Sequence, residues 1–201
     1  MSAGPTSERV QQRLKRLIME RHYRPGTRLE PAELASALAS STTPIREALN
    51  HLVGVGLVES RSGSGFLVPL IDEPGLKDLY GWSGDILALA LRSSRPVLLQ
   101  AIEVDPDMVS HADRTADLFH RIAATSRNRE HTDAMARINS RLHPARLGEP
   151  DVLDDVEAEL DGLIRWTGMG DVRSLRRAVS AYHLRRHRTA ARLLHDIYRG
   201  D

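Results

Sequence analysis

The ten residues SSTTPIREAL, from Ser40 to Leu49, constrain the fold of this chain more than any other stretch. Proline inside a helix costs about 3 kcal/mol, but in the first turn its missing N–H is not needed. Pro44 therefore predicts the start of a helix, and Ser41 or Thr43 can cap the free N–H groups there. Arg46 follows one turn later. Such a helix tip is either an ordinary cap or a surface that contacts an anion.

The elements around this helix follow in a compact order. Apolar residues at helical spacing predict a first helix over SERVQQRLKRLIMERH, capped by Ser7, and a short second helix over PAELASAL. A Pro25-Gly26 turn and a short extended piece separate them. The third helix should turn four apolar residues toward the core: Ile45, Ala48, Leu49 and Leu52.

A hairpin should follow the third helix. Leu57-Val58 and Phe66-Leu67-Val68 are strand-like, and the tip Gly63-Ser64-Gly65 permits positive φ angles. Helix, strand, helix, turn, helix and hairpin is the order of a winged helix-turn-helix. We therefore predict this fold for residues 1–70.

Composition limits the other possibilities. At 201 residues the chain can hold two small domains, and without cysteine it has no disulfide, thiolate zinc site or cysteine nucleophile. It has no apolar run of membrane-spanning length and no signal-peptide core, so we expect a cytoplasmic protein. The formal net charge is only +1, but residues 1–70 carry nine Arg or Lys against six Asp or Glu. The positive end therefore contains the unusual helix tip.

The first domain resembles the DNA-binding domain of the GntR family of bacterial transcription regulators. The resemblance runs through residues 24–68, RPGTRLEPAELASALASSTTPIREALNHLVGVGLVESRSGSGFLV. It comprises a Pro-Gly turn, part of an L-x-E-x-x-L-A element, the S-x-T-P-x-R-E-A-L recognition helix, Gly-Leu-Val and a glycine-tipped wing. Several separated elements match in the same order along the chain. This is a stronger indication of the family than a single short motif would be.

The resemblance implies a DNA-binding surface, and the chemistry of the residues agrees with it. A recognition helix contacts bases from its first turns, while cations, hydroxyls and N–H groups hold phosphates. The expected DNA-binding residues lie in the extended piece, the helix tip and the wing: Arg28, Ser41, Thr42, Thr43, Arg46, Arg61, Ser62, Gly63 and Ser64.

The chain departs from the family pattern at four positions. Ala32 and Thr42 stand where many members carry arginines that contact guanine, so about 1–3 kcal/mol of discrimination per pair is lost. The operator should therefore differ from the usual guanine-containing half-site. Ala39-Ser40 replaces the common glycine and apolar residue of the tight turn, which should strain the turn slightly without removing it.

Residues 71–201 should form an all-helical domain after the linker-like IDEPGLKD. We expect helices near 75–92, 96–103, 106–126, 129–142, 151–166 and 171–197, with Pro106 and Asp151 close to two of the starts. ADLFHRIAATSRN and GDVRSLRRAVSAYHLRRH resemble segments of the effector domain in the FadR-like branch of the family. The resemblance implies ligand binding and dimerisation by this domain.

Many members of that branch bind a divalent metal, such as zinc or nickel, through one Asp and three His. His120 and His183 match two of these histidines, Asp161 falls near the third, and the family's Asp falls on Ala116. Asp117 is adjacent but turned by about 100° on a helix, and His187 could substitute because it lies one turn after His183. The set is incomplete for a metal, and protonated histidines could hold an anionic effector, such as a carboxylate, in its place.

The sequence thus predicts a mainly α protein and a ligand-responsive, homodimeric transcription regulator, most often a repressor in this family. Its partners should be a near-palindromic DNA operator and a small-molecule effector. Two alternatives stay open. One is a winged-helix protein-interaction module that has lost DNA binding. The other is a metal-dependent enzyme, although no nucleophile elbow or phosphate loop is present and we expect no enzymatic activity.

Overall fold

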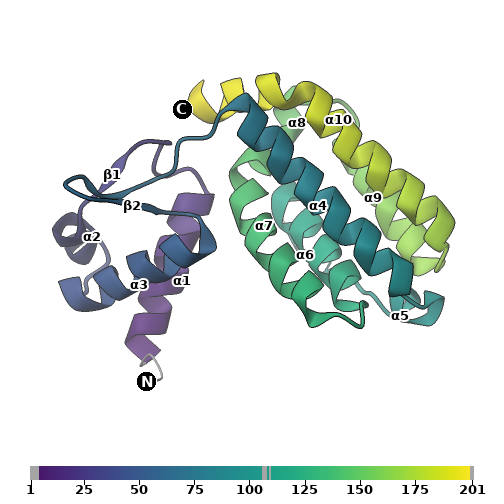
Figure 1. Ribbon diagram of the computed structural model, residues 1–201, viewed down its shortest axis with the longest axis horizontal. Coiled ribbons are helices and arrows are strands. Elements are labelled where there is room, and N and C mark those ends of the chain that lie inside the picture. Colours follow the sequence, from purple (N-terminus) through teal and green to yellow (C-terminus); the bar gives the residue numbers. More distant parts are fainter. Residues whose placement is uncertain (1–4, 106–107, 109, 200–201) are drawn as a thin grey trace. The chain divides into compact units, whose positions relative to one another are not determined.

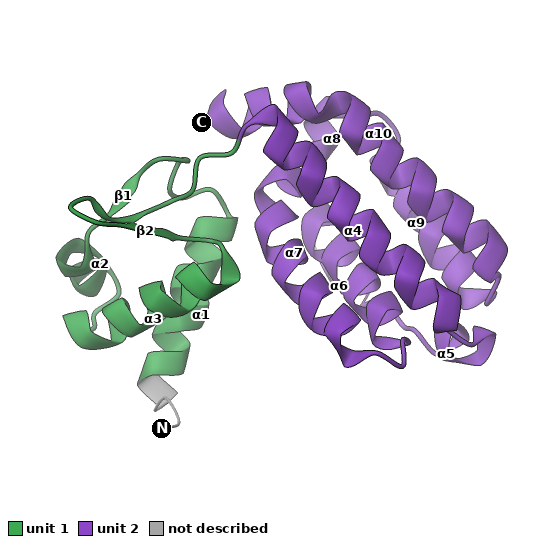
Figure 2. Ribbon diagram, in the orientation of Figure 1, with its two compact units in different colours: residues 1–71 green, residues 72–201 purple. Residues whose placement is uncertain are grey.

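The computed structural model describes residues 5–105, 108 and 110–199 (Figure 1). Its contacts divide the chain into two compact units, residues 1–71 and 72–201 (Figure 2). The boundary lies one residue beyond the position expected from the sequence.

The N-terminal unit contains three helices and a three-stranded antiparallel sheet. The elements are α1 (Pro5–Met19), β1 (Arg28–Leu29), α2 (Pro31–Ala37), α3 (Thr42–Val55), β2 (Glu59–Arg61) and β3 (Gly65–Leu67). The strand order is β1-β3-β2, with Phe66 of β3 opposite both Leu29 and Ser60. Apolar side chains from all three helices and the sheet form one core, so the unit is the predicted winged helix-turn-helix.

Two local predictions for this unit were wrong. Leu57 and Val58 are buried in the core but precede the strand, which begins at Glu59. Ser7 does not cap α1, because the helix already begins at Pro5. The Ser7 hydroxyl instead donates to Glu47 Oε2 of α3 at 3.1 Å, so it joins two helices.

The described residues of the C-terminal unit form seven helices and contain no strand. The helices are α4 (Glu73–Ser93), α5 (Pro96–Gln100), α6 (His111–Ala124), α7 (Arg129–Leu147), α8 (Glu149–Val152), α9 (Val156–Gly168) and α10 (Val172–Arg199). The long helices α4 and α10 lie side by side, α4 also packs on α7, and α7 packs on α6. No helix in the described part of the chain combines the length and apolarity that crossing a membrane requires.

Two helix starts differ from the sequence prediction. α6 begins at His111, where the Ser110 hydroxyl accepts hydrogen bonds from the first-turn N–H groups, while the predicted start at Pro106 lies outside the described residues. Asp151 does not open a long helix. It belongs to α8, which ends at Val152, and α9 begins only after Asp155, whose left-handed φ of 52° breaks the helical path.

A buried carboxylate joins the helices of this unit. Glu149 of α8 accepts hydrogen bonds from the Tyr80 hydroxyl of α4 (2.8 Å), from Tyr182 of α10 (3.2 Å) and from Arg186 of α10 (2.8 Å). His111 Nε2 of α6 lies 3.2 Å from the same carboxylate. Burial alone would raise the pKa of Glu149, but its hydrogen bond with His111 and the charge of Arg186 lower that pKa to about 2. Glu149 is therefore ionised across the neutral range.

Glu149→Gln should lower the free energy of unfolding of the helical unit by about 1.5–3 kcal/mol, because it removes one of the two carboxylates that pair with the buried Arg186 charge and leaves only Glu159. Glu157→Gln is the matched control. Glu157 also contacts His111 but is half exposed, so its loss should cost less than about 1 kcal/mol. Urea unfolding followed by circular dichroism measures both. Equal midpoints for the two variants would contradict the assigned role of Glu149.

Candidate nucleic-acid interface and effector region

The apolar face of α3 determines which of its side chains face outward. Ile45, Ala48, Leu49 and Leu52 are buried, as the sequence predicted. Thr42, Thr43 and Arg46 are consequently exposed at the first turns of the helix. Ser41 occupies the N-cap position with extended backbone angles, but its hydroxyl makes no capping hydrogen bond. The Ser41 hydroxyl therefore does not occupy the free N–H groups at the helix tip. These N–H groups and the hydroxyls can contact an anion.

The tight turn before α3 has the strain that its sequence predicted. Ala39 adopts a left-handed φ of 48°, a conformation that costs a residue with a Cβ atom roughly 1–2 kcal/mol relative to glycine. The turn persists because the chain is held on both sides, for example by the Ser40 N–H, which donates to the Ala35 carbonyl at 2.9 Å. This turn fixes the angle at which α3 leaves α2.

The wing supplies the remaining predicted contacts. Ser62, Gly63 and Ser64 form the exposed turn between β2 and β3, with Gly63 at a φ of 79°. In Figure 1 this turn and the first turn of α3 lie toward the same end of the N-terminal unit. Arg28 on β1 approaches the wing, since its guanidinium lies 3.9 Å from an ideal Cβ position on Gly65. The two segments that carry the predicted DNA-binding residues thus lie toward one end of the unit.

The three arginines of this surface differ in their present partners. Arg61 forms an ion pair with Glu59 at 2.7 Å, and Arg28 pairs with Glu30. Such exposed pairs are worth at most about 1 kcal/mol and can be exchanged for phosphate contacts. Arg46 is exposed and, within the described part of the chain, has no carboxylate at ion-pair distance. Of the three arginines, Arg46 is therefore the one that can contact DNA without first breaking an ion pair.

The predicted metal and effector residues of the helical unit do not converge. Asp161 is exposed and accepts from Arg114 at 3.3 Å, while Asp117 pairs with Arg121 at 2.6 Å. His120 is half-buried on α6. Among residues 5–105, 108 and 110–199, no three His, Asp or Glu side chains form a group that could hold a metal ion. The side chains present therefore do not fit the family's metal site.

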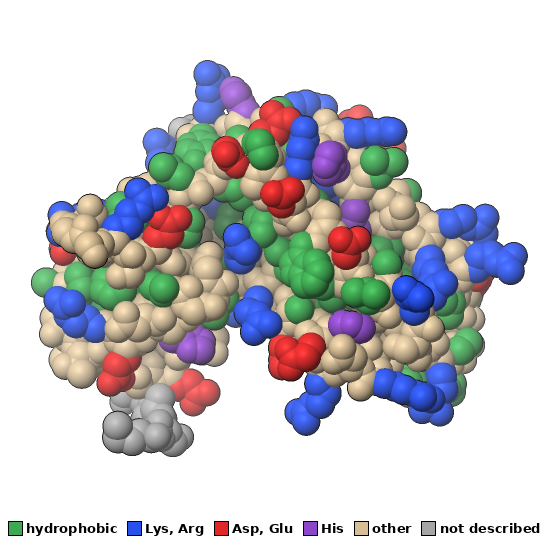
Figure 3. Space-filling view, in the orientation of Figure 1, with side chains coloured by type: hydrophobic (Ala, Val, Ile, Leu, Met, Phe, Trp, Pro, Cys, Tyr) green, Lys and Arg blue, Asp and Glu red, His purple; other side chains and the backbone are tan. Residues whose placement is uncertain are grey.

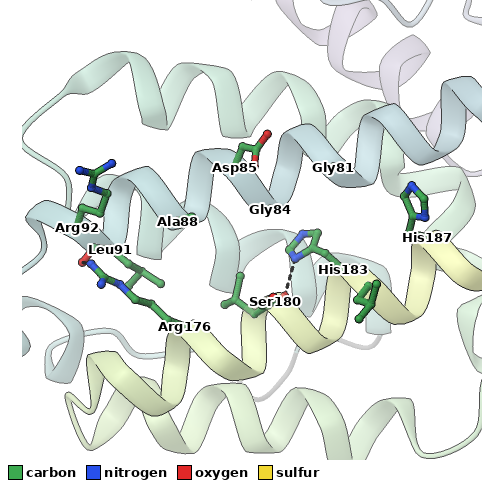
Figure 4. Close-up of a pocket in the computed structure, with 12 residues that line it drawn as sticks. Gly81, Gly84, Asp85, Ala88, Leu91, Arg92, Arg176, Ser180, His183 and His187 are labelled. Atoms are coloured by element: carbon green, nitrogen blue, oxygen red, sulfur yellow. Dashed lines mark hydrogen bonds between the residues drawn. The ribbon is translucent and has the colours of Figure 1, made fainter.

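His183 and His187 lie together along a groove between α4 and α10 (Figure 4). His187 is exposed, whereas His183 is buried and points to α4, where its Nε2 lies 3.0 Å from Ser83 Oγ. Its Nδ1 lies 2.7 Å from the Val179 carbonyl. Burial lowers the pKa of His183 to about 3. The imidazole is therefore neutral at pH 7, and the expectation that a protonated His183 holds an anion was wrong.

A different cation occupies the bundle interior, and sequence reasoning missed it. Arg146 of α7 is fully buried and donates from one Nη atom to Asn139 Oδ1 at 2.8 Å. Its guanidinium lies 5.3 Å from the centre of the Phe119 ring, which stacks on His183. Nε and the second Nη atom have no hydrogen-bond partner among the described residues. Spacing alone does not identify such an arginine, because Asn139 lies two turns earlier on α7 but Phe119 comes from α6.

Comparison with known proteins agrees with this geometry. Residues 6–68 match the family model of bacterial regulatory proteins, gntR family. The N-terminal unit is therefore a winged helix-turn-helix that matches the DNA-binding domain of the gntR family of bacterial regulatory proteins.

Similarity also extends into the helical unit. The Nta operon transcriptional regulator of Aminobacter aminovorans is 30% identical over 138 residues, which cover 62% of this chain and 66%, just under two thirds, of that protein. A structure from Rhodococcus sp. RHA1, solved as that of a GntR transcriptional regulator, has a TM-score of 0.72 at 16% identity and covers 94% of this chain and 97% of its own. Escherichia coli McbR/YncC has a TM-score of 0.69 at 19% identity, with 96% and 99% covered. These structures share the fold of both units.

The buried, neutral state of His183 has a consequence for acid stability. The unfolded chain binds a proton near pH 6.5 while the folded chain does not until about pH 3, so stability falls as the pH drops through this window. Between pH 6.5 and 5 the loss should be about 2 kcal/mol. His183→Gln should remove most of this slope, and the exposed control His187→Gln should keep it. Urea titrations at stepped pH measure the slope, and an unchanged slope in His183→Gln would refute the assignment.

Proposed function

We propose that this protein is a sequence-specific DNA-binding transcription regulator, acting in the cytoplasm as a homodimer and most simply as a repressor. The observation that supports this best is the outward tip of α3, where Thr42, Thr43 and Arg46 are exposed beside a capping residue with no capping bond. The gntR-family match over residues 6–68 supports the same proposal.

A homodimer follows from the size of the DNA-binding surface. One winged helix contacts few phosphates, and specific affinity usually comes from two half-sites on the same face of the duplex. We therefore propose a near-palindromic operator. Because Ala32 and Thr42 provide no guanidinium, its half-sites should depend less on guanine contacts than those of family members with arginine at these positions.

A protein-interaction module without DNA binding would need no exposed cation at the helix tip. A transcription regulator, in contrast to an enzyme, needs no catalytic group. We propose that the chain is not an enzyme. Salt dependence separates the two binding functions, since DNA affinity falls steeply with salt as counter-ions are released.

Arg46→Ala should abolish specific operator binding, with at least a 100-fold loss of affinity, and leave the fold intact because the side chain is exposed. The test is a gel-shift titration on duplexes selected from a random library with the wild-type protein. Arg13→Ala, an exposed cation on α1, is the matched control and should bind like the wild type. Wild-type affinity in Arg46→Ala would exclude α3 as the recognition helix.

We further propose that the regulator responds to a small carboxylate bound at Arg146. A buried guanidinium with unused donors is costly, by about 1–3 kcal/mol for each unsatisfied group, so such groups usually have a role. Asn139 holds Arg146 in place while its own amide donates to the Ala116 carbonyl at 2.8 Å. The remaining Nε and Nη donors form the fork that matches a carboxylate. The proposal includes no metal, because the predicted ligands do not converge.

Arg146→Gln should remove the response to carboxylates without weakening operator binding in their absence. Thermal shift assays with a panel of two- to six-carbon mono- and dicarboxylates give the measurement, since ligand at 100 times its dissociation constant stabilises by about 2.7 kcal/mol. Arg141→Gln, at an exposed position of the same helix, should respond like the wild type. The proposal fails if no carboxylate stabilises the wild type, or if Arg146→Gln responds equally.

A further inference from the structure

Asn50 lies on the outer face of α3, one helical turn after Arg46. The buried apolar stripe of α3 turns the opposite side of the helix away from the core, and Asn50 is about 140° round the helix from the fully buried Ile45. Asn50 is exposed, and its amide makes no hydrogen bond within the described part of the chain. Its donor and acceptor are therefore available to a partner outside the chain.

The fold gives no reason for an asparagine at this position. Asparagine is a poorer helix former than alanine, because its amide competes for backbone hydrogen bonds. It is common at helix ends, where it caps, but Asn50 lies in the middle of α3 and caps nothing. A residue that costs helix stability and neither packs nor caps points to a contact outside the fold.

The other residues on the line of Asn50 have short side chains. Thr43 lies two turns earlier and Gly54 one turn later, and both are exposed. A Cβ atom on Gly54 would have no atom within 4 Å beyond its own helix backbone, so the fold does not require this glycine, although glycine weakens a helix. Short side chains let α3 lie close to the floor of a major groove. An asparagine can then reach the edges of the bases.

The charged side chains of α3 flank Asn50. Arg46 and Glu47 lie one turn earlier on either side of it, and Glu47 accepts a hydrogen bond from the Ser7 hydroxyl of α1 at 3.1 Å. Figure 3 shows few charged side chains on the visible surface over α3. Phosphates are held mainly by cations, whereas base edges offer uncharged donors and acceptors. A neutral amide in this place therefore suits a base better than a phosphate.

We propose that Asn50 is a specificity-determining residue that selects adenine at one position of each half-site. In the major groove adenine presents the N7 acceptor beside the N6 amino donor, and the asparagine amide is complementary, with Nδ2 donating to N7 and Oδ1 accepting from N6. Guanine presents two acceptors, thymine an acceptor and a methyl group, and cytosine a donor. None of these three matches both atoms of the amide.

The position of this adenine follows from the geometry of the helix. Four residues of an α-helix rise about 6 Å, and base pairs are stacked about 3.4 Å apart. The adenine should therefore lie about two base pairs from the base pair nearest to Arg46. This inference deepens the proposed function and rests on it.

The experiment selects duplexes from a random library with the intact wild-type chain and with Asn50→Ala. The variant should lose the preference for adenine at one position of each half-site and keep the preferences at the other positions. On the selected duplex, guanine in place of this adenine should weaken wild-type binding about tenfold or more, and binding by Asn50→Ala less than about threefold. Asn50→Arg should change the preference at this position to guanine.

A modified base tests the contact itself. 7-Deazaadenine lacks the N7 acceptor, so at this position it should weaken wild-type binding about fivefold or more and leave binding by Asn50→Ala unchanged. Gln12→Ala is the matched control, because Gln12 is an exposed amide on α1 and should not affect selection. Circular dichroism should be the same for all variants, since both positions are exposed.

Three results would overturn the inference. Asn50→Ala could select the same bases as the wild type, or the affected position could carry a base other than adenine. A loss of affinity by the same factor on every duplex would indicate a phosphate contact instead.

The inference and the proposed function can be told apart. If the wild type selects no duplex, the proposed function fails and the role of Asn50 fails with it. If the wild type selects a duplex and Arg46→Ala loses affinity for it, while Asn50→Ala keeps the adenine preference, only the role of Asn50 is wrong.

Discussion

Each helix of this protein can bury only part of its surface, and the part that is left outward decides what the helix can do. In α3 the buried stripe from Ile45 to Leu52 leaves a polar tip outward, and that tip suits DNA. In α4 the buried stripe leaves Trp82 and Leu89 outward, and water is a poor environment for them. The same constraint therefore leaves a polar helix tip outward in one unit and two large apolar side chains outward in the other.

Inside the helical unit, one buried carboxylate adds polar contacts between helices that apolar side chains also hold together. Glu149 holds α4, α6 and α10 through Tyr80, His111 and Arg186. A buried charge is tolerable only when its partners are fixed, so this network also fixes the relative positions of the helices. Arg146 lies close enough for its charge to act on Glu149, yet it keeps unused donors. The Glu149 carboxylate is thus fully hydrogen-bonded, whereas two donor atoms of Arg146 have no partner among the described residues.

The sequence predicted the first unit far better than the second, and the reason is the range of the interactions. Pro44, the glycine-tipped wing and the inward residues of α3 act locally, so their spacing predicts the elements and most of the DNA-binding surface. The strand start at Glu59 was missed because burial of Leu57 and Val58 looks the same in a strand and in a connecting segment.

The helical unit depends on contacts between distant positions. Glu149 and Tyr80 are 69 residues apart, and His183 and Ser83 are 100 residues apart. No periodicity connects such pairs, so histidines matched by position were assigned to one pocket although their side chains do not converge. Arg146 was missed for the same reason. Its guanidinium contacts Phe119 of α6 and Asn139 of α7, and neither contact can be inferred from the residues around Arg146.

The same helix links the two proposed binding events. α4 begins at Glu73, two residues after the end of the N-terminal unit, and packs on both α7, which carries Arg146, and α10. A ligand changes an equilibrium only through different affinities for two states. A carboxylate that binds Arg146 more tightly in one packing of α7 against α4 would favour that packing, and α4 is the helix that continues the chain from the N-terminal unit.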